Sequence, residues 1–190
     1  MKFLNKYNNP KNIRFKSFEK TFKICLERNH KTIVETGTAR GKTKFFFIRR
    51  YNWKDGMSTP MFGEYAKYVN GTLHTCDISE ENINNARSFT KNYVDFIKFY
   101  VNDSLIFLKE FRGKIDLLYL DSLDGHDPIA ASEHQLKEVK ISLNKLHNDS
   151  LILLDDKGSK TNLSISFLLN NDYNRSEEHT SELQSPMYLV

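Results

Sequence analysis

Residues 32–43 read TIVETGTARGKT, and the interpretation of the whole chain starts from this stretch. A short β-branched run ends at the carboxylate of Glu35, and a turn containing Gly37 and Gly41 follows. Gly37 lets the backbone approach a ligand closely, and the first turn of a following helix would offer unpaired N–H groups. A strand, a glycine turn and a helix start in this order therefore predict a ligand cradle.

Two common nucleotide motifs do not fit this stretch. A P-loop needs four residues between its first glycine and the Gly-Lys-Thr, whereas three separate Gly37 from Gly41. The dinucleotide fingerprint needs a Gly-x-Gly pair, but Ala39 stands where the second glycine belongs, which disfavours an NAD-dependent oxidoreductase. What remains is Glu35-x-Gly37-x-x-x-Gly41; the alternative is that these glycines only make a turn.

The composition indicates one soluble domain. The chain has 190 residues, of which 39% are hydrophobic and 27% charged. A net charge of +4 without a basic, aromatic-rich stripe does not indicate nucleic acid as a partner. No apolar run approaches membrane-spanning length, and the N-terminus lacks the apolar core of a signal peptide, so we expect a cytoplasmic protein without a membrane partner.

Apolar strand patterns alternate with helical patterns along the chain, which predicts a parallel sheet covered by helices on both faces. The predicted strands cover 32–35, 72–76, 97–101, 115–120 and 150–154. The predicted helices cover 13–29, 42–50, 61–69, 79–91, a segment opened by 102–104, 128–147 and 161–170. Ser58 or Thr59 is the expected cap of the third helix.

Acidic residues follow every predicted strand. Because the carboxyl ends of parallel strands share one edge of the sheet, these side chains are expected to line a common binding edge. Each of them, taken singly, could instead be a solvated strand end or a helix cap. The residues concerned are Glu35, Asp77, Asp103, Asp121, Asp155 and Asp156.

These motifs together resemble class I S-adenosylmethionine-dependent methyltransferases over residues 31–169. The nearer likeness is to the branch of macrocin-type, cephalosporin-cluster and caffeoyl-CoA-like O-methyltransferases. The resemblance implies an α/β fold with a Rossmann-like, doubly wound parallel sheet of order 3-2-1-4-5, closed in the family by an antiparallel hairpin. The implied methyltransferase domain spans residues 31–174, after an N-terminal tail and helix at 1–30.

The resemblance also implies a cofactor site for S-adenosylmethionine. Its turn would hold the methionine part, Asp77 would accept hydrogen bonds from the ribose hydroxyls, and Asp103 with Ser104 would lie beside the adenine. The rival interpretation of Asp103 is a helix cap. The implied residues of the turn are Glu35, Gly37, Thr38 and Gly41.

A divalent cation is implied as well, at Asp121, Asp155 and Asp156. Oxygen-only ligands suit Mg²⁺, and a cation would relieve the repulsion among three carboxylates. Such an ion would lower the pKa of a substrate hydroxyl and orient it toward the methyl group. The alternative is that Asp155 and Asp156 cap a loop in water. Together with Asp121, His126 is a candidate catalytic residue as a general base, although many loop histidines have no such role.

The sequence changes character after residue 174. Residues 175–185, RSEEHTSELQS, resemble the translation of a sequencing-library adapter, which suggests a truncated gene fused to an artefact. We therefore expect residues 175–190 to be disordered with few core contacts. The family's closing hairpin would then be absent, and the fifth strand would have an unpaired edge.

The resulting prediction is a metal-assisted O-methyltransferase that acts on a small hydroxylated molecule, such as a sugar or a natural-product intermediate. The alternative is a Rossmann-like module that binds a nucleotide or the cofactor without catalysis. A homo-oligomer is left open. The truncated chain could also be inactive, whatever its parent does.

Overall fold

The computed structural model describes the chain at residues 1–40, 42–45, 48–51, 53, 57–123, 127–156, 158–174 and 188–189. For 42–45, 48–51 and 188–189 it describes the backbone only. None of the helices in these ranges has both the length and the apolar composition that crossing a membrane requires.

A six-stranded sheet forms the centre of the fold, in the order β5-β4-β1-β6-β7-β8. The first five of these strands run parallel, so their order by position in the chain is 3-2-1-4-5, as predicted. Of these, β6 and β7 are short apolar runs buried at every residue, as expected of strands covered on both faces. The strands are β1 (Thr32–Thr36), β4 (Thr72–Asp77), β5 (Ile97–Val101), β6 (Leu117–Leu120), β7 (Leu151–Leu154) and β8 (Tyr188–Leu189).

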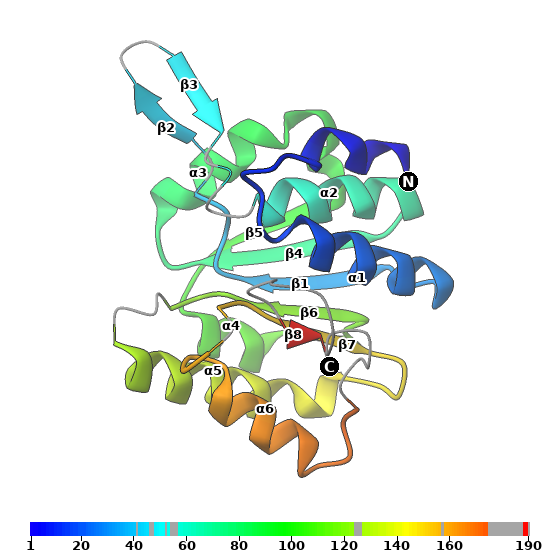
Figure 1. Ribbon diagram of the computed structural model, residues 1–190, viewed down its shortest axis with the longest axis vertical. Helices are drawn as coiled ribbons and strands as arrows, with labels where there is room; N and C mark the ends of the chain where they lie inside the picture. The colour runs from blue at the N-terminus through cyan, green and yellow to red at the C-terminus, as the bar shows by residue number, and fades with distance from the viewer. Residues whose placement is uncertain are drawn as a thin grey trace.

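Helices cover both faces of this sheet (Figure 1). One layer holds η1 (Lys2–Tyr7), α1 (Phe15–Glu27), α2 (Ser58–Val69), α3 (Glu80–Phe89) and η3 (Lys91–Phe96). The other layer holds α4 (Ser104–Glu110), α5 (Pro128–Ser142), η4 (Leu143–Lys145) and α6 (Asn162–Leu169).

Alternate residues of the strands supply the two hydrophobic cores. In β6, Leu117 and Tyr119 belong to the core under α1 and α2, while Leu118 and Leu120 belong to the core over α4 and α5. This follows from the two-residue period of a strand, in which successive side chains point to opposite faces. Helices can therefore pack on both faces of the sheet, because strands such as β6 and β7 present apolar side chains to each face.

One predicted helix is wrong. Residues 42–50 were expected to continue the glycine turn as a helix, but they contain β2 (Lys42–Phe45) and β3 (Ile48–Tyr51), which pair antiparallel. The segment is rich in aromatic and β-branched residues, whose preference for strands outweighs the helix signal. Figure 1 shows this hairpin projecting from the body of the molecule.

The sequence predicted an unpaired outer edge for β7, and this prediction is also wrong. Leu153 pairs with Leu189 and Leu154 with Tyr188, so β8 adds a short antiparallel strand there. The backbone of β8 thus pairs with backbone groups that β7 would otherwise leave unpaired at the edge of the sheet. The expectation of few core contacts concerns mainly residues 175–187, which lie outside the described residues.

Candidate active site

Gly37 makes the sharp turn at the end of β1. Its φ is +83°, and a Cβ there would lie 2.0 Å from the backbone oxygen of Asp121. Only glycine combines this conformation with so close an approach. The Gly37 N–H donates to the carbonyl of Cys76 at 2.9 Å, so the turn joins the ends of three neighbouring strands, β4, β1 and β6.

Glu35, predicted at the cofactor, is a fully buried residue that faces α2. Its carboxylate accepts from the hydroxyls of Ser58 at 2.6 Å, Thr59 at 2.8 Å and Thr75 at 2.6 Å. Burial raises the pKa of Glu35 to about 7, although the three hydroxyl donors favour the ionised form. Glu35 thus ties the start of α2 to the sheet from behind the glycine turn.

This contact also explains a misassigned helix cap. Ser58 and Thr59 lie inside the first turn of α2, and the N-cap is Met57 with a positive φ of 51°. The two hydroxyls, expected to cap the helix, point their hydrogens at Glu35 instead. Thr59 also accepts from the backbone N–H of Ala39 at 2.9 Å, which fixes the residues after Gly37.

Asp77, at the end of β4, lies beside the glycine turn. Its carboxylate accepts from the backbone N–H groups of Thr38 at 3.1 Å and Ser79 at 2.8 Å, and from the amide of Asn82 at 3.2 Å. The Nδ2 of Asn82 lies 3.2 Å from both carboxylate oxygens, so three donor groups make four contacts to about four lone pairs. A ligand hydroxyl would donate to Asp77 in place of one of these contacts.

Two hollows that share lining residues lie at this edge of the sheet. The larger has a volume of about 670 Å³ and is lined by Gly37, Thr38, Asp77 and Asp121 among others. The smaller, of about 100 Å³, shares Gly37 and Asp77 with it. Its walls include Asp103, Ser104 and His134.

Asp103 does cap a helix, as its rival interpretation held. The backbone N–H groups of Leu105 and Ile106 both donate to its Oδ1, at 2.9 and 3.1 Å. Ser104, next to it, contacts Nε2 of His134 through its hydroxyl at 2.9 Å. His134 was not singled out in the sequence, because nothing near it in the chain marks this contact.

Asp121, Asp155 and Asp156 come together as predicted. One carboxylate oxygen from each lies within 4.8 Å of the others. Two basic side chains that sequence reasoning missed bind all three of them. Arg14 forms a two-point pair with Asp155 at 2.6 and 2.8 Å and also reaches Asp156 at 3.0 Å.

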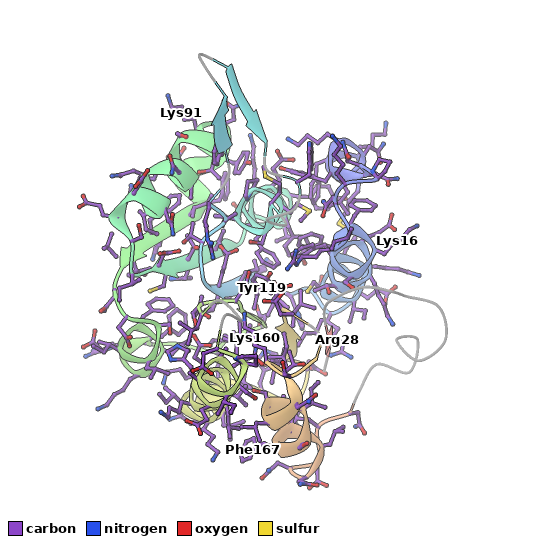
Figure 2. The ribbon with its side chains drawn as sticks, turned by 60° about the vertical axis from the view of Figure 1, so that its left-hand side comes forward. Lys16, Arg28, Lys91, Tyr119, Lys160 and Phe167 are labelled. Atoms are coloured by element: carbon purple, nitrogen blue, oxygen red, sulfur yellow. The ribbon has the colours of Figure 1, made fainter. Side chains whose placement is uncertain are left out.

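Lys160 completes this cluster from the turn before α6. Its Nζ lies 3.1 Å from Oδ1 of Asp121 and 3.4 Å from Oδ2 of Asp156. The hydroxyl of Tyr119 donates to Oδ2 of Asp121 at 3.3 Å. Figure 2 shows Tyr119 and Lys160 close together in the middle of the molecule.

The implied metal ion does not fit this cluster as it is bonded. Each of the six carboxylate oxygens already has an Arg14, Lys160 or Tyr119 donor within 3.4 Å. A divalent ion bound at these oxygens would lie next to the positive charges of Arg14 and Lys160, which would repel it. The prediction of Mg²⁺ at these residues is therefore not supported by the geometry.

The pKa values of the cluster reflect its crowded charges. Burial and the neighbouring Asp155 raise the pKa of Asp121 well above its usual value, and Lys160 opposes this. Burial lowers the pKa of Lys160, but Asp121 and Asp156 outweigh it and leave that pKa raised. Gly41 and His126, the remaining predicted site residues, lie outside the described residues.

Of the two basic residues that were not predicted, Lys160 has a signal in the local sequence and Arg14 has none. Lys160 follows Asp156 by four residues, a spacing that often pairs opposite charges. Arg14 lies 141 residues before Asp155, and only the fold brings them together.

The family model of the methyltransferase domain matches residues 34–157 of this chain, which contain the glycine turn, Asp77 and the acidic cluster. A comparison with curated proteins finds no match. Solved structures that match this fold include several methyltransferases.

Three of these structures illustrate the range of similarity. The SAH-bound Podospora anserina methyltransferase PaMTH1 is 20% identical, with a TM-score of 0.54, covering 73% of this chain and 51% of its own. The O-methyltransferase NovP is 11% identical, with a TM-score of 0.62, over 93% and 78% of the two chains. The N-methyltransferase NodS from Bradyrhizobium japonicum is 12% identical, with a TM-score of 0.61, over 96% and 95%.

The fold and the edge of its sheet define a Rossmann-like methyltransferase domain. The chain belongs to the family defined by this methyltransferase domain. It spans about half the length of PaMTH1.

Proposed function

We propose that this protein transfers the methyl group of S-adenosylmethionine to a hydroxyl oxygen of a small hydroxylated acceptor. The observation that carries the proposal is the pair of hollows at the carboxyl ends of the strands, with Gly37 and Asp77 lining both. The choice of oxygen as the acceptor atom rests on the resemblance to O-methyltransferases, because the O-methyltransferase NovP and the N-methyltransferase NodS both have this fold.

The cofactor assignments follow from which residues line which hollow. Asp77, held by three donors, would accept from the ribose hydroxyls, and the Gly37–Thr38 turn would contact the methionine part. Asp103 and Ser104 line the smaller hollow, where the adenine would lie. Because both cap bonds of Asp103 go to Oδ1, its Oδ2 can accept from the adenine amino group while the cap persists.

Glu35 has a different role in this proposal. Its two oxygens are taken by Ser58, Thr59 and Thr75, so it would position the turn rather than contact the cofactor. This assigns to Glu35 a structural link between α2 and β1. It replaces the direct contact that the resemblance implied.

When bound, S-adenosylmethionine supplies an electrophilic methyl group. The chain's own contribution would be to hold the acceptor hydroxyl in line with that group and to accept its proton. Asp121 lines the larger hollow, and its raised pKa would make its carboxylate a stronger base than an ordinary aspartate. A metal ion is not part of this mechanism, because the acidic cluster is bound by Arg14 and Lys160.

Titration calorimetry would test the cofactor assignment first. We expect S-adenosylmethionine and S-adenosylhomocysteine to bind with a 1:1 ratio and NAD not to bind. Binding of NAD alone would overturn the proposal. Methyl transfer to a panel of hydroxylated sugars and phenols, followed with a labelled methyl group, would then test catalysis; cofactor binding without transfer would favour a non-catalytic binding module.

A further inference from the structure

The acidic cluster resembles a metal site in its residues but not in its bonding. Asp155 is 2% exposed at its side chain and Lys160 is 4% exposed, so both charges are shielded from water. Buried charges are tolerated only when they are paired and hydrogen-bonded. The pairing here comes from two residues of the chain itself.

Arg14 bridges two carboxylates, as a metal ion would. Its planar guanidinium gives Nε and Nη2 to the two oxygens of Asp155, and Nη2 also reaches Asp156. This fork-like geometry matches a carboxylate better than a point charge does. Arg14 is the N-cap residue of α1, so the pair also holds the start of α1 against the end of β7.

Lys160 bridges the other two carboxylates, Asp121 and Asp156, as a compact point charge. Three carboxylates and two cations leave this group with a formal charge of −1, against −3 without the cations. A divalent ion would supply +2, the same compensation as Arg14 and Lys160 together. The two arrangements are therefore alternatives for the same electrostatic problem.

We propose that Arg14 and Lys160 are built-in counter-ions that take the place of a divalent metal at Asp121, Asp155 and Asp156. The site is then independent of metal, and Lys160 is a positioning residue that holds Asp121 at the cleft. The link to Asp121 in catalysis rests on the proposed function. The ion-pair arrangement stands on the observed contacts alone.

Manganese binding tests this directly, because free Mn²⁺ gives an electron paramagnetic resonance signal that is lost on binding. We expect the wild-type chain to leave the signal of millimolar Mn²⁺ unchanged. The variant Lys160→Met removes one cation and frees two carboxylate oxygens, so its affinity for Mn²⁺ should rise by about tenfold or more. Arg14→Met should have the same direction of effect.

Matched controls separate site effects from general loss of positive charge. Lys16→Met and Arg28→Met change the same residue types elsewhere on α1 or at its end, and should leave Mn²⁺ affinity at the wild-type level. Lys160→Arg keeps the charge and should also not bind Mn²⁺. Circular dichroism would verify that each variant is folded, and the wild-type measurement remains decisive where one is not.

Tight Mn²⁺ binding by the wild type that disappears in Asp121→Asn or Asp155→Asn would overturn the inference. These measurements need no acceptor and no turnover, so they are separate from the test of methyl transfer. Where transfer is observed, we expect a chelator to leave its rate unchanged. A chelator-sensitive rate restored by Mg²⁺ would also count against the built-in counter-ions.

Discussion

At the scale of single residues, Glu35 shows how a motif position can serve structure. The resemblance implied a contact with the cofactor for this carboxylate, yet three hydroxyls surround it and it is fully buried. Burial disfavours the ionised form of a carboxylate, and hydrogen bonds from neutral hydroxyls offset this cost only in part. Its pKa of about 7 records that balance.

This raised pKa predicts a loss of stability as pH rises. Below the unfolded pKa of about 4.5 both states are protonated; between 4.5 and 7 only the unfolded state ionises, so the free energy of unfolding falls. At about 1.4 kcal/mol per pH unit, Glu35 lowers it by about 3 kcal/mol in total by pH 7. Urea denaturation at pH 5 and pH 8 should show a smaller fall in Glu35→Gln than in the wild type. An identical fall in both would contradict the assignment.

Asp77 should act on cofactor binding in addition to holding the glycine turn. Asp77→Ala removes the carboxylate proposed to bind the ribose, and we expect cofactor affinity to fall by about ten- to a hundredfold, as for a lost hydrogen bond to a charged group. Asp95→Ala, an exposed aspartate in η3, is the control. Calorimetry with S-adenosylhomocysteine measures both; unchanged affinity in Asp77→Ala would remove the ribose assignment.

Gly37 allows backbone strain and steric overlap to be measured separately. Gly37→Ala adds a strained positive φ and a Cβ 2.0 Å from a backbone oxygen, so we expect a loss of about 3 kcal/mol or more in unfolding free energy. Gly113 also has a positive φ, of +121°, but nothing lies within 4 Å of its Cβ position. Gly113→Ala should therefore add backbone strain of about 1–3 kcal/mol without the steric overlap, and cost less than Gly37→Ala. Equal losses in the two variants would mean that the close approach is not what requires Gly37.

At the scale of secondary-structure elements, regular patterns were readable and irregular ones were not. The five parallel strands follow from short apolar runs that alternate with helices, whereas their order was implied by the resemblance to the methyltransferase family. The Ser79 cap of α3 is confirmed by its bond from the N–H of Asn82. These features are local, so the residues that decide them are neighbours in the chain.

The prediction of a helix where β2 and β3 form a hairpin was wrong for a physical reason that is also local. Lys42, Phe45 and Ile48 fit a helical face as readily as they fit a strand, and short mixed runs have no decisive period. The ion pair of Arg14 with Asp155 was not predicted for the opposite reason: no local sequence pattern indicates a contact between residues 141 positions apart. The grouping of carboxylates at one edge of the sheet was predictable, because parallel topology alone brings the strand ends together. The positions of their counter-ions, Arg14 and Lys160, were not predictable in this way.

The capping of α4 by Asp103 gives a prediction at this scale. Asp103→Ala removes an acceptor shared by two backbone N–H groups, and we expect a loss of about 1 kcal/mol in unfolding free energy. Asp103→Ser, which can still cap, should recover most of it. Cofactor affinity that falls in Asp103→Ser despite the recovered stability would support the adenine contact, since serine caps without a carboxylate. Unchanged stability in Asp103→Ala would mean that the cap contributes little here.

At the scale of the whole molecule, segments from both ends of the chain meet at β7. Arg14, before α1, binds Asp155 just past the end of β7, and β8 pairs with the same strand near the C-terminus. α1 also lies in contact with β8. The outer part of the sheet is thus held by the N-terminal helix and by a C-terminal strand together.

This arrangement predicts that β8 stabilises the sheet edge although it spans two residues. A chain ending at residue 174 exposes the backbone groups of β7, so we expect its melting temperature to fall by a few degrees and its tendency to associate to rise. Leu189→Pro removes the N–H of a residue paired with Leu153 and should shift both in the same direction without changing the chain length. Thermal unfolding and light scattering on the three proteins measure the two effects. Identical melting and scattering in all three would show that β8 adds nothing to the edge, and that the apolar layer beneath α1 holds β7 by itself.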